Sequence, residues 1–317
     1  MSIEPNIKVS IICNAYNHEQ YIRSALDGFV MQKTDFAFEV LIHDDASTDR
    51  TADIIREYEI KYPHLIKPIY QAENQYSKNG ISQFQYPRVK GKYIAACEGD
   101  DYWTDPLKLQ KQFDAMEAHP EVDICAHGAV QVDANTGKKL DLICPANHNT
   151  ILATEDVIYG GGGYVATASL FYRTNILVAP PKFRQFLRLD YTLQIHGALR
   201  GGMLYLSDCM SVYRALATGS WSTRMLGDQK MRQAHDQKVV QMLNILNEET
   251  AGKYDSVIQK KLLFNEFRNH VTENECKKAL SKKYREIFKT LPIKNRVSIR
   301  IKAVFPFLTT LMRNLKK

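Results

Sequence analysis

The chain has 317 residues, 44% hydrophobic and 24% charged, with a net charge of +7. This composition is typical of a soluble globular protein and excludes a disordered one. No apolar run approaches the roughly 20 residues that a membrane-spanning helix needs, and the first residues lack the basic and apolar pattern of a secretory signal. We therefore expect a cytoplasmic protein without a transmembrane helix.

The cysteines and histidines show no metal-binding pattern. The six cysteines are widely spaced, with no Cys-x-x-Cys pair, and most lie in apolar runs where a reduced cysteine acts as a small hydrophobic residue. His43, His127 and His196 also lack the spacing of zinc ligands. We expect neither disulfides nor a zinc site.

The first 120 residues alternate between strand-like apolar runs and stretches with helical periodicity. The predicted strands are residues 9–13, 38–42, 66–70 and 93–97. Three helices are predicted: one covers residues 22–30, the second begins near Thr51, and the third begins at Asp105-Pro106. Asn17, with Gln20 three residues later, is predicted to cap the first helix. This alternation predicts an α/β fold with a Rossmann-like, mostly parallel central sheet and helices on both faces.

Two acidic segments each follow a predicted strand. They are Asp44-Asp45-Ala46-Ser47-Thr48-Asp49 and Glu98-Gly99-Asp100-Asp101. Ligands of open α/β sheets bind outside the carboxyl ends of the strands, so the two segments are expected to share one site. Neighbouring carboxylates repel one another, and a hard divalent cation removes that repulsion while leaving positions open for substrate phosphates. The pattern favours a metal-bound nucleotide, and a solvated acidic turn is the alternative.

The pattern changes beyond about residue 120. Residues 122–132 look extended, and four glycines at 160–163 precede an apolar stretch over 164–172. These glycines lack the Gly-Lys-Ser/Thr ending of a phosphate loop, so we expect a flexible turn there. Residues 228–290 are rich in Lys, Gln, Glu, Leu and Met and predict helices.

Taken in order, these segments resemble the inverting glycosyltransferases of family 2, which have the GT-A fold. The matching segments are Val9-Ser10-Ile11-Ile12, Ala15-Tyr16-Asn17, residues 38–49, residues 91–95, residues 98–103 and Asp105-Pro106. Residues 189–190, 210–214 and 219–222 look like the second half of bacterial members that build surface polysaccharides. The resemblance implies a catalytic domain over residues 1–225, with a nucleotide-binding half (1–120) and an acceptor-side half (121–225). A helical region over residues 226–317, with a basic extension, follows it.

The resemblance also implies how a nucleotide is bound. Ala15 and Tyr16 would lie beside the base, where an aromatic ring contributes about 1 to 3 kcal/mol. Asp45 would accept a hydrogen bond from a uracil ring. A surface tyrosine is the alternative for Tyr16, a helix cap is the alternative for Asp45, and Asp44 is a weaker, structural candidate.

The Asp-x-Asp motif of the family reads Glu98-Gly99-Asp100 in this chain. The resemblance implies that Glu98 faces the ribose and that Asp100, and next Asp101, bind Mn²⁺ or Mg²⁺. Such an ion stabilises the charge on the departing nucleoside diphosphate. Arg214 resembles a family arginine near the diphosphate, where its planar group can hold two phosphate oxygens; an ordinary strand end is the alternative.

Asp190 is the candidate general base. In the family this acid stands in a Glu-Asp or Gly-Asp pair that opens a helix, and here the pair is Leu189-Asp190. A helix N-cap is the alternative for Asp190. Trp221 and Ser222 are expected to line the acceptor side or a loop that closes over the donor.

The positive charge is concentrated at the C-terminus. Residues 277–317 contain thirteen Lys and Arg and one Glu, a net charge of +12, which leaves −5 for residues 1–276. An apolar stripe is expected at Leu308, Leu311, Met312 and Leu315, and residues 293–305 alternate apolar with basic residues. This pattern suits a helix at an anionic membrane surface, close to a lipid-linked acceptor. A solvated basic helix is the alternative, and no nucleic-acid partner is expected because no known reader module is present.

The sequence therefore predicts a metal-dependent inverting glycosyltransferase of cell-surface polysaccharide synthesis, such as capsule or lipopolysaccharide. It would move a hexosyl or N-acetylhexosaminyl group from a UDP-sugar to a glycan or lipid-linked acceptor. A dehydrogenase is excluded because residues 14–17, Asn-Ala-Tyr-Asn, replace the glycine-rich turn after the first strand; a sugar nucleotidyltransferase would need a similar loop. An inactive sugar-nucleotide-binding module remains the alternative, since Glu98 and Leu189 depart from the family pattern.

Overall fold

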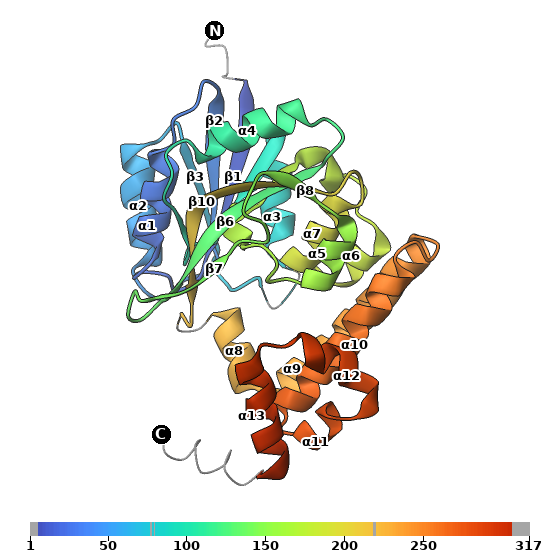
Figure 1. The fold of residues 1–317 in the computed structure, drawn as a ribbon. Helices are drawn as coiled ribbons and strands as arrows, with labels where there is room; N and C mark the ends of the chain where they lie inside the picture. The colour runs from blue at the N-terminus through green and yellow to red at the C-terminus, as the bar shows by residue number, and fades with distance from the viewer. Residues whose placement is uncertain (1–5, 77, 79, 218–219, 306–317) are drawn as a thin grey trace. The chain divides into compact units, whose positions relative to one another are not determined.

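The computed structural model describes residues 6–76, 78, 80–217 and 220–305 (Figure 1). The chain divides into two compact units, Met1–Gln233 and Ala234–Lys317. Within the described ranges, no helix is both long and apolar enough to cross a membrane.

Across the described residues of the first unit, ten strands form one sheet. The strand order is β3-β2-β1-β4-β9-β6-β10-β5, with β7 beside β6 and β8 beside β10. The strands are β1 (Ile7–Ala15), β2 (Ala37–Asp44), β3 (Ile66–Tyr70), β4 (Tyr93–Ala96), β5 (Tyr102–Trp103), β6 (Ile124–Asp133), β7 (Lys139–Ile143), β8 (Thr150–Leu152), β9 (Phe171–Arg173) and β10 (Met203–Ala215). Strands β1 to β4, β6 and β10 run in one direction. The predicted mostly parallel sheet is thus confirmed.

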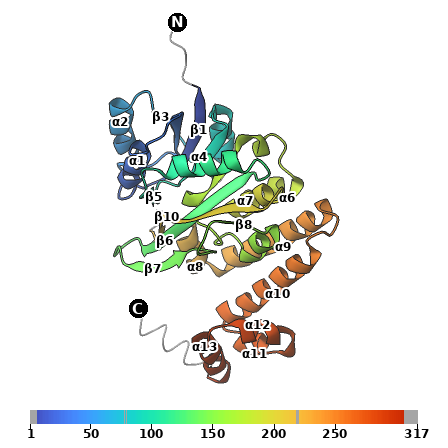
Figure 2. The same cartoon turned by 45° about the horizontal axis from the view of Figure 1, so that its top comes forward.

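Helices cover both faces of the sheet (Figure 1, Figure 2). They are α1 (Ile22–Val30), α2 (Thr51–Lys61), α3 (Ser82–Gln85), α4 (Lys108–Ala118), α5 (Thr154–Gly160), α6 (Lys182–Phe186) and α7 (Asp190–Ala198). A further helix, α8 (Trp221–Gly227), follows β10. Apolar residues of α1, α2 and α4 share one core with alternate residues of β1, as the two-residue period of a strand requires. On the other face α7 lies so close that a Cβ at Gly197 would be 2.6 Å from the Cβ of Ile124.

Most of the predicted elements of the first 120 residues are present. The helix over 22–30 and the strand over 66–70 match within a residue. The predicted cap at Asn17 is wrong, because the helix begins five residues later, at Ile22. Asn17 instead adopts a left-handed backbone conformation (φ 55°), and its carboxamide oxygen accepts the main-chain N–H of Thr48 at 2.8 Å. It therefore joins the two loops that follow β1 and β2.

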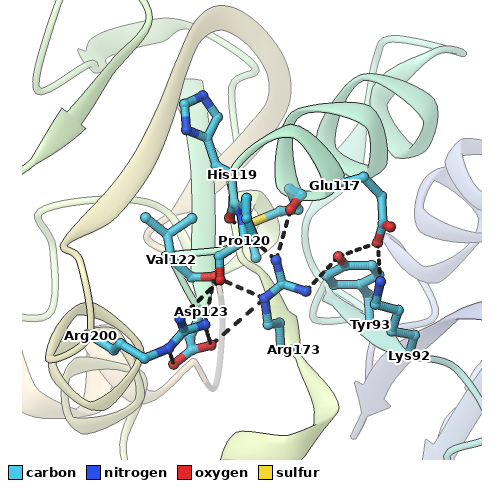
Figure 3. A network of polar contacts seen from close by, with 10 residues as sticks. Lys92, Tyr93, Glu117, His119, Pro120, Val122, Asp123, Arg173 and Arg200 are labelled. Atoms are coloured by element: carbon cyan, nitrogen blue, oxygen red, sulfur yellow. Dashed lines mark hydrogen bonds and ion pairs between the residues drawn. The ribbon is translucent and has the colours of Figure 1, made fainter.

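At the amino ends of the strands, a polar network ties the sheet together (Figure 3). The Arg173 guanidinium, at the end of β9, donates to the Val122 carbonyl at 2.9 Å and to the Tyr93 hydroxyl at 2.8 Å. Asp123 accepts two hydrogen bonds from Arg200, which follows α7. These charged hydrogen bonds fix the starts of β4 and β6 relative to β9.

The second unit consists of helices, which confirms the prediction of a helical C-terminal region. The helices are α9 (Gln229–Glu249), which begins in the first unit, α10 (Asp255–Thr272), α11 (Cys276–Ala279), α12 (Arg285–Thr290) and α13 (Ile293–Val304). They bury a small core of their own. Its buried members are Phe267, Cys276, Ala279, Tyr284, Phe288, Ile299 and Ala303. The apolar stripe predicted at Leu308, Leu311, Met312 and Leu315 lies outside the described residues.

One buried charge in the first unit has a measurable consequence. The Lys108 side chain is fully buried, and its Nζ has no hydrogen-bond partner among the described residues. The Nζ lies 3.7 Å from the centroid of the Trp103 ring, a cation–π contact. Burial lowers the pKa of Lys108 to about 7.

We expect the free energy of unfolding to rise with pH between about pH 7.5 and 9.5 because of Lys108. Its pKa is lower in the folded protein than in the unfolded chain, so the unfolded state binds more protons over this range, and raising the pH favours folding. The gain is at most about 1.4 kcal/mol per pH unit. Urea unfolding at each pH should show this slope reduced in Lys108→Met and retained in a variant of the exposed Lys33, Lys33→Met. Equal slopes in all three proteins would contradict it.

Candidate functional site

The two acidic segments meet at one edge of the sheet. The last residues of β1 and β2 are register partners, Ala15 opposite Asp44, and β4 lies on the other side of β1. Residues 98–101, here called the acidic turn, follow β4 almost directly. The carboxyl ends of three neighbouring parallel strands therefore carry both segments.

The acidic turn is pressed against the end of β1. The Gly99 main-chain N–H donates to the Asn14 carbonyl at 2.9 Å, and the Asn14 side-chain amide donates to the Glu98 carboxylate at 3.2 Å. A Cβ at Gly99 would lie 2.8 Å from Nδ1 of His18, so a larger residue would push the turn away. Three buried atoms here lack a partner among the described residues: Asn14 Oδ1, His18 Nδ1 and Asp44 Oδ1. Such orphaned polar atoms are typical of a site that binds a ligand, an ion or water.

Two carboxyl groups act on a third, Glu98, at this edge. Burial, then the charges of Asp190 and Asp100, raise the pKa of Glu98 to about 8. Burial also raises the pKa of Asp190, while a hydrogen bond from the Thr167 hydroxyl opposes that rise. Asp190 nevertheless keeps contact with solvent, so protein surrounds this group without sealing it. The charges of Asp100 and Asp190 therefore both act on Glu98 at an edge that solvent can reach.

Asp190 is the first residue of α7, and the residue before it, Leu189, occupies the N-cap position. The Asp190 carboxylate accepts a hydrogen bond from the Thr167 hydroxyl. The helix-cap alternative for Asp190 is therefore wrong. A carboxylate in the first turn of a helix is stabilised by the helix dipole, and the charge of Asp190 raises the pKa of Glu98 in the acidic turn.

Asp45 is buried and holds the loop that follows β3. Its two carboxylate oxygens accept the main-chain N–H groups of Gln75, at 2.7 Å, and of Tyr76, at 3.1 Å. The cap of α2 is Arg50, so the helix-cap alternative for Asp45 is also wrong. A carboxylate oxygen has two lone pairs. One lone pair on each Asp45 oxygen therefore remains for a further hydrogen-bond donor, provided that the loop leaves room for that donor.

The same loop brings Tyr76 to the site. Tyr76 is 52% exposed. The partial burial of its hydroxyl raises the pKa of that group, the charge of Arg224 on α8 lowers it, and the charges of Glu98 and Asp190 raise it. The hydroxyl therefore lies within electrostatic range of an acid from the acidic turn, an acid from α7 and a base from α8. The sequence contains no signal that would assign Tyr76, Thr167 or Arg224, because their proximity depends on loops.

Arg214 and Asp101 hold the acidic turn in shape. The Arg214 main-chain N–H donates to the buried Asp101 carboxylate at 2.8 Å, and its guanidinium donates to the Asp100 carbonyl at 2.8 Å. The guanidinium also lies over the rings of Tyr102 and Tyr21, 4.3 and 5.2 Å from their centroids. These contacts commit both side chains to the turn. Diphosphate binding by Arg214 and metal binding by Asp101 stay predictions.

The remaining predicted residues lie at the rim or outside the description. Ala15 is buried at the end of β1, and Tyr16 beside it is exposed. Trp221 and Ser222 open α8, but their side chains lie outside the described part of the structure.

A divalent cation fits the donor set at Asp100. Among the described residues, no three His, Cys, Asp or Glu side chains are grouped as a metal site. Mg²⁺ in nucleotide enzymes is bound by one or two carboxylates together with substrate phosphates. Asp100 is half-buried and faces other acids, whose repulsion a cation would relieve.

The mostly parallel sheet, with acids at its carboxyl edge and helices on both faces, is similar to that of the GT-A glycosyltransferases. Residues 10–188 match the profile of glycosyl transferase family 2. The chain belongs to this family, and the predicted fold and family are confirmed.

Individual relatives support this membership. The chain is 38% identical over 217 residues to the uncharacterized protein Rv1520 of Mycobacterium tuberculosis, an alignment that covers 67% of this chain and 60% of the relative. It is 28% identical over 216 residues to an uncharacterized glycosyltransferase of Nostoc sp., alr2836, covering 66% of this chain and 65% of the relative. The chain thus matches about three fifths of the length of these relatives. The structure of residues 1–349 of TarS from S. aureus has a similar fold, with a TM-score of 0.58 and 18% identity; the match covers 94% of this chain and 81% of that TarS fragment.

Asp45→Asn is expected to release the loop over residues 74–76. A carboxamide has one oxygen to accept one of the two N–H groups, and its own NH₂ faces the other. Hydrogen bonds to a charged group contribute about 1.5 to 3 kcal/mol each, so amide hydrogen exchange in this loop should accelerate at least about tenfold. Exchange measured by mass spectrometry on peptides of α2 serves as the internal control. Unchanged protection of Gln75 and Tyr76 would show that Asp45 does not hold the loop.

Proposed function

We propose that the chain is a metal-dependent inverting glycosyltransferase that moves a sugar from a UDP-sugar to a glycan or lipid-linked acceptor. The observation that carries this proposal is that Glu98 and Asp100 of the acidic turn and Asp190 of α7 lie at one sheet edge, close enough that the charges of Asp100 and Asp190 raise the pKa of Glu98. Further support comes from TarS structures in complex with UDP and with UDP-GlcNAc, which share the fold at TM-scores of 0.52. A hexosyl or N-acetylhexosaminyl donor is the expected class.

The donor would bind along the carboxyl ends of β1, β2 and β4. In this proposal Ala15 and Tyr16 lie beside the base. Asp45 accepts a hydrogen bond from the base, and Glu98 faces the ribose. Asp100 would hold Mn²⁺ or Mg²⁺, assisted by Asp101, and the ion would stabilise charge on the departing diphosphate. Arg214 would approach the same phosphates, and Trp221 and Ser222 would lie in the segment closing over the donor.

Asp190 would act as the general base. Its carboxylate accepts the proton of the acceptor hydroxyl while the hydroxyl oxygen forms a bond to the anomeric carbon. On the opposite face, the bond from that carbon to the diphosphate oxygen breaks, and UDP leaves with the electron pair. The Thr167 hydroxyl holds the Asp190 carboxylate in one orientation, as a base needs to be positioned.

The proposal extends to place and pathway. The basic residues 277–317 support a peripheral position at the inner face of the cell membrane, where a lipid-linked acceptor is found. A Bacillus subtilis glycosyltransferase named for teichuronic acid biosynthesis, TuaG, is 34% identical over 108 residues, 34% of this chain and 41% of TuaG. This partial likeness supports a role in cell-surface polysaccharide synthesis.

Asp190→Asn should lower turnover by about 10² to 10⁴ and leave UDP affinity nearly unchanged. The amide cannot take the proton, yet it preserves the size of the side chain. UDP release in the presence of acceptor measures turnover, and calorimetry measures affinity. Unchanged turnover would remove Asp190 from this role.

A second variant, Thr167→Val, tests the same assignment through pH. The Thr167 hydroxyl lowers the pKa of Asp190, so its removal should raise that pKa. The acid limb of the rate profile should then move to higher pH, with the rate recovering above the new pKa. An unshifted limb in Thr167→Val would argue that another group is the base.

Asp100→Ala should weaken the manganese-dependent binding of UDP by about tenfold or more. Titration with UDP in Mn²⁺ and in EDTA measures this difference, and Asp53→Ala, which removes an exposed acid of α2, is the matched control.

A panel of UDP-sugars with Mn²⁺, followed by UDP release, identifies the donor. Donor binding without release from any sugar would favour the inactive binding module instead.

A further inference from the structure

Helix α13 in the second unit exposes a stripe of apolar residues. The exposed fractions are 71% for Ile293, 47% for Val297, 48% for Ile301 and 66% for Val304. At about 100° per residue these positions fall within an arc of about 80° on the helix. Four large apolar side chains on one arc differ from single exposed residues scattered over a surface, which need no explanation.

The exposed stripe is not the face by which α13 is attached. Ile299 and Ala303 are buried in the core of the second unit, where they join Phe267 and Phe288. These two residues lie on a different side of the helix from the exposed stripe. The helix is therefore apolar on two sides, and the described part of this unit covers one of them.

Basic side chains border the exposed stripe. Lys294 lies about 20° beyond Ile301 on one side, and Arg300 lies about 20° beyond Ile293 on the other. With Arg296 and Lys302 they give Ile293–Val304 four positive charges and no acid. Among the described residues, none of these four side chains has a carboxylate within ion-pair distance. An apolar stripe with a cationic border on each side matches the boundary between acyl chains and anionic headgroups.

We propose that the stripe of Ile293, Val297, Ile301 and Val304 is an interfacial membrane-binding surface for anionic phospholipid. Helix α13 lies in the plane of the bilayer surface, with these side chains among the acyl chains and with Lys294 and Arg300 reaching the headgroup phosphates. This inference rests on the peripheral membrane position in the proposed function, and it names the described residues that would make the contact. A second copy of the chain would find a like-charged border of four cations, which disfavours that occupant.

The test is flotation of the full chain with vesicles of neutral phosphatidylcholine, or of phosphatidylcholine with about 30% phosphatidylglycerol. The unmodified protein should bind the anionic vesicles at least tenfold more strongly than the neutral ones, and less strongly at high salt. Val297→Ser with Ile301→Ser should lower the partition coefficient for anionic vesicles at least tenfold without any change in charge. Lys294→Gln with Arg300→Gln should abolish most of the preference for anionic lipid.

The control is Ile60→Ser with Val178→Ser, which removes two apolar residues of the first unit that are even more exposed, at 81% and 84%, and should bind like the unmodified protein. Circular dichroism and thermal melting verify that each variant folds. The proposal is overturned by equal binding of the Val297/Ile301 variant and the unmodified protein, or by binding to neither vesicle. It is also overturned if light scattering shows a dimer that this variant dissociates while vesicle binding stays absent. Flotation needs neither nucleotide nor metal, so its outcome does not depend on catalysis.

Discussion

The repulsion between carboxylates at the carboxyl edge of the sheet is the constraint on which the site depends. Glu98, Asp100 and Asp190 come from two segments about ninety residues apart, yet the charges of Asp100 and Asp190 both raise the pKa of Glu98. Such a group of partly desolvated carboxylates is costly unless protons or a cation neutralise it. A fold that assembles acids in this way is organised for a ligand that carries positive charge or brings a cation with it.

The rest of the first unit can be understood as what keeps these acids together against their repulsion. The main chain of the acidic turn is held by two hydrogen bonds, one from the Gly99 N–H to the Asn14 carbonyl and one from the Arg214 guanidinium to the Asp100 carbonyl. The polar network around Arg173 ties β9 to the starts of β4 and β6. Because β4 leads to the acidic turn and the segment after β9 leads to α7, this network sets the relation between the two acid-bearing segments.

Sequence reasoning succeeded where a local pattern determines the outcome. Apolar periodicity predicted α1 and β3, and the placement of acids after strands predicted that they share an edge, because parallel strands end together. It failed where a side chain bonds across loops: Asn17 binds Thr48 rather than its own helix. No local pattern predicts that Thr167 meets Asp190, since the pair depends on how a short helical turn packs beside α7. The hydrogen bonds by which Arg214 and Asp101 hold the acidic turn were not predicted, for the same reason.

If Asp45 receives the base of a nucleotide, as proposed, its contacts link that base to the surroundings of Asp190. Its carboxylate is occupied by the N–H groups of Gln75 and Tyr76, so a base that bonds to Asp45 either shares these oxygens or displaces the loop. Displacement would move Tyr76, whose hydroxyl lies in the field of Glu98 and Asp190. A ligand shifts such an equilibrium only by its differential affinity for the two loop positions. Occupation of the base site would therefore change the surroundings of the proposed general base without any direct contact between them.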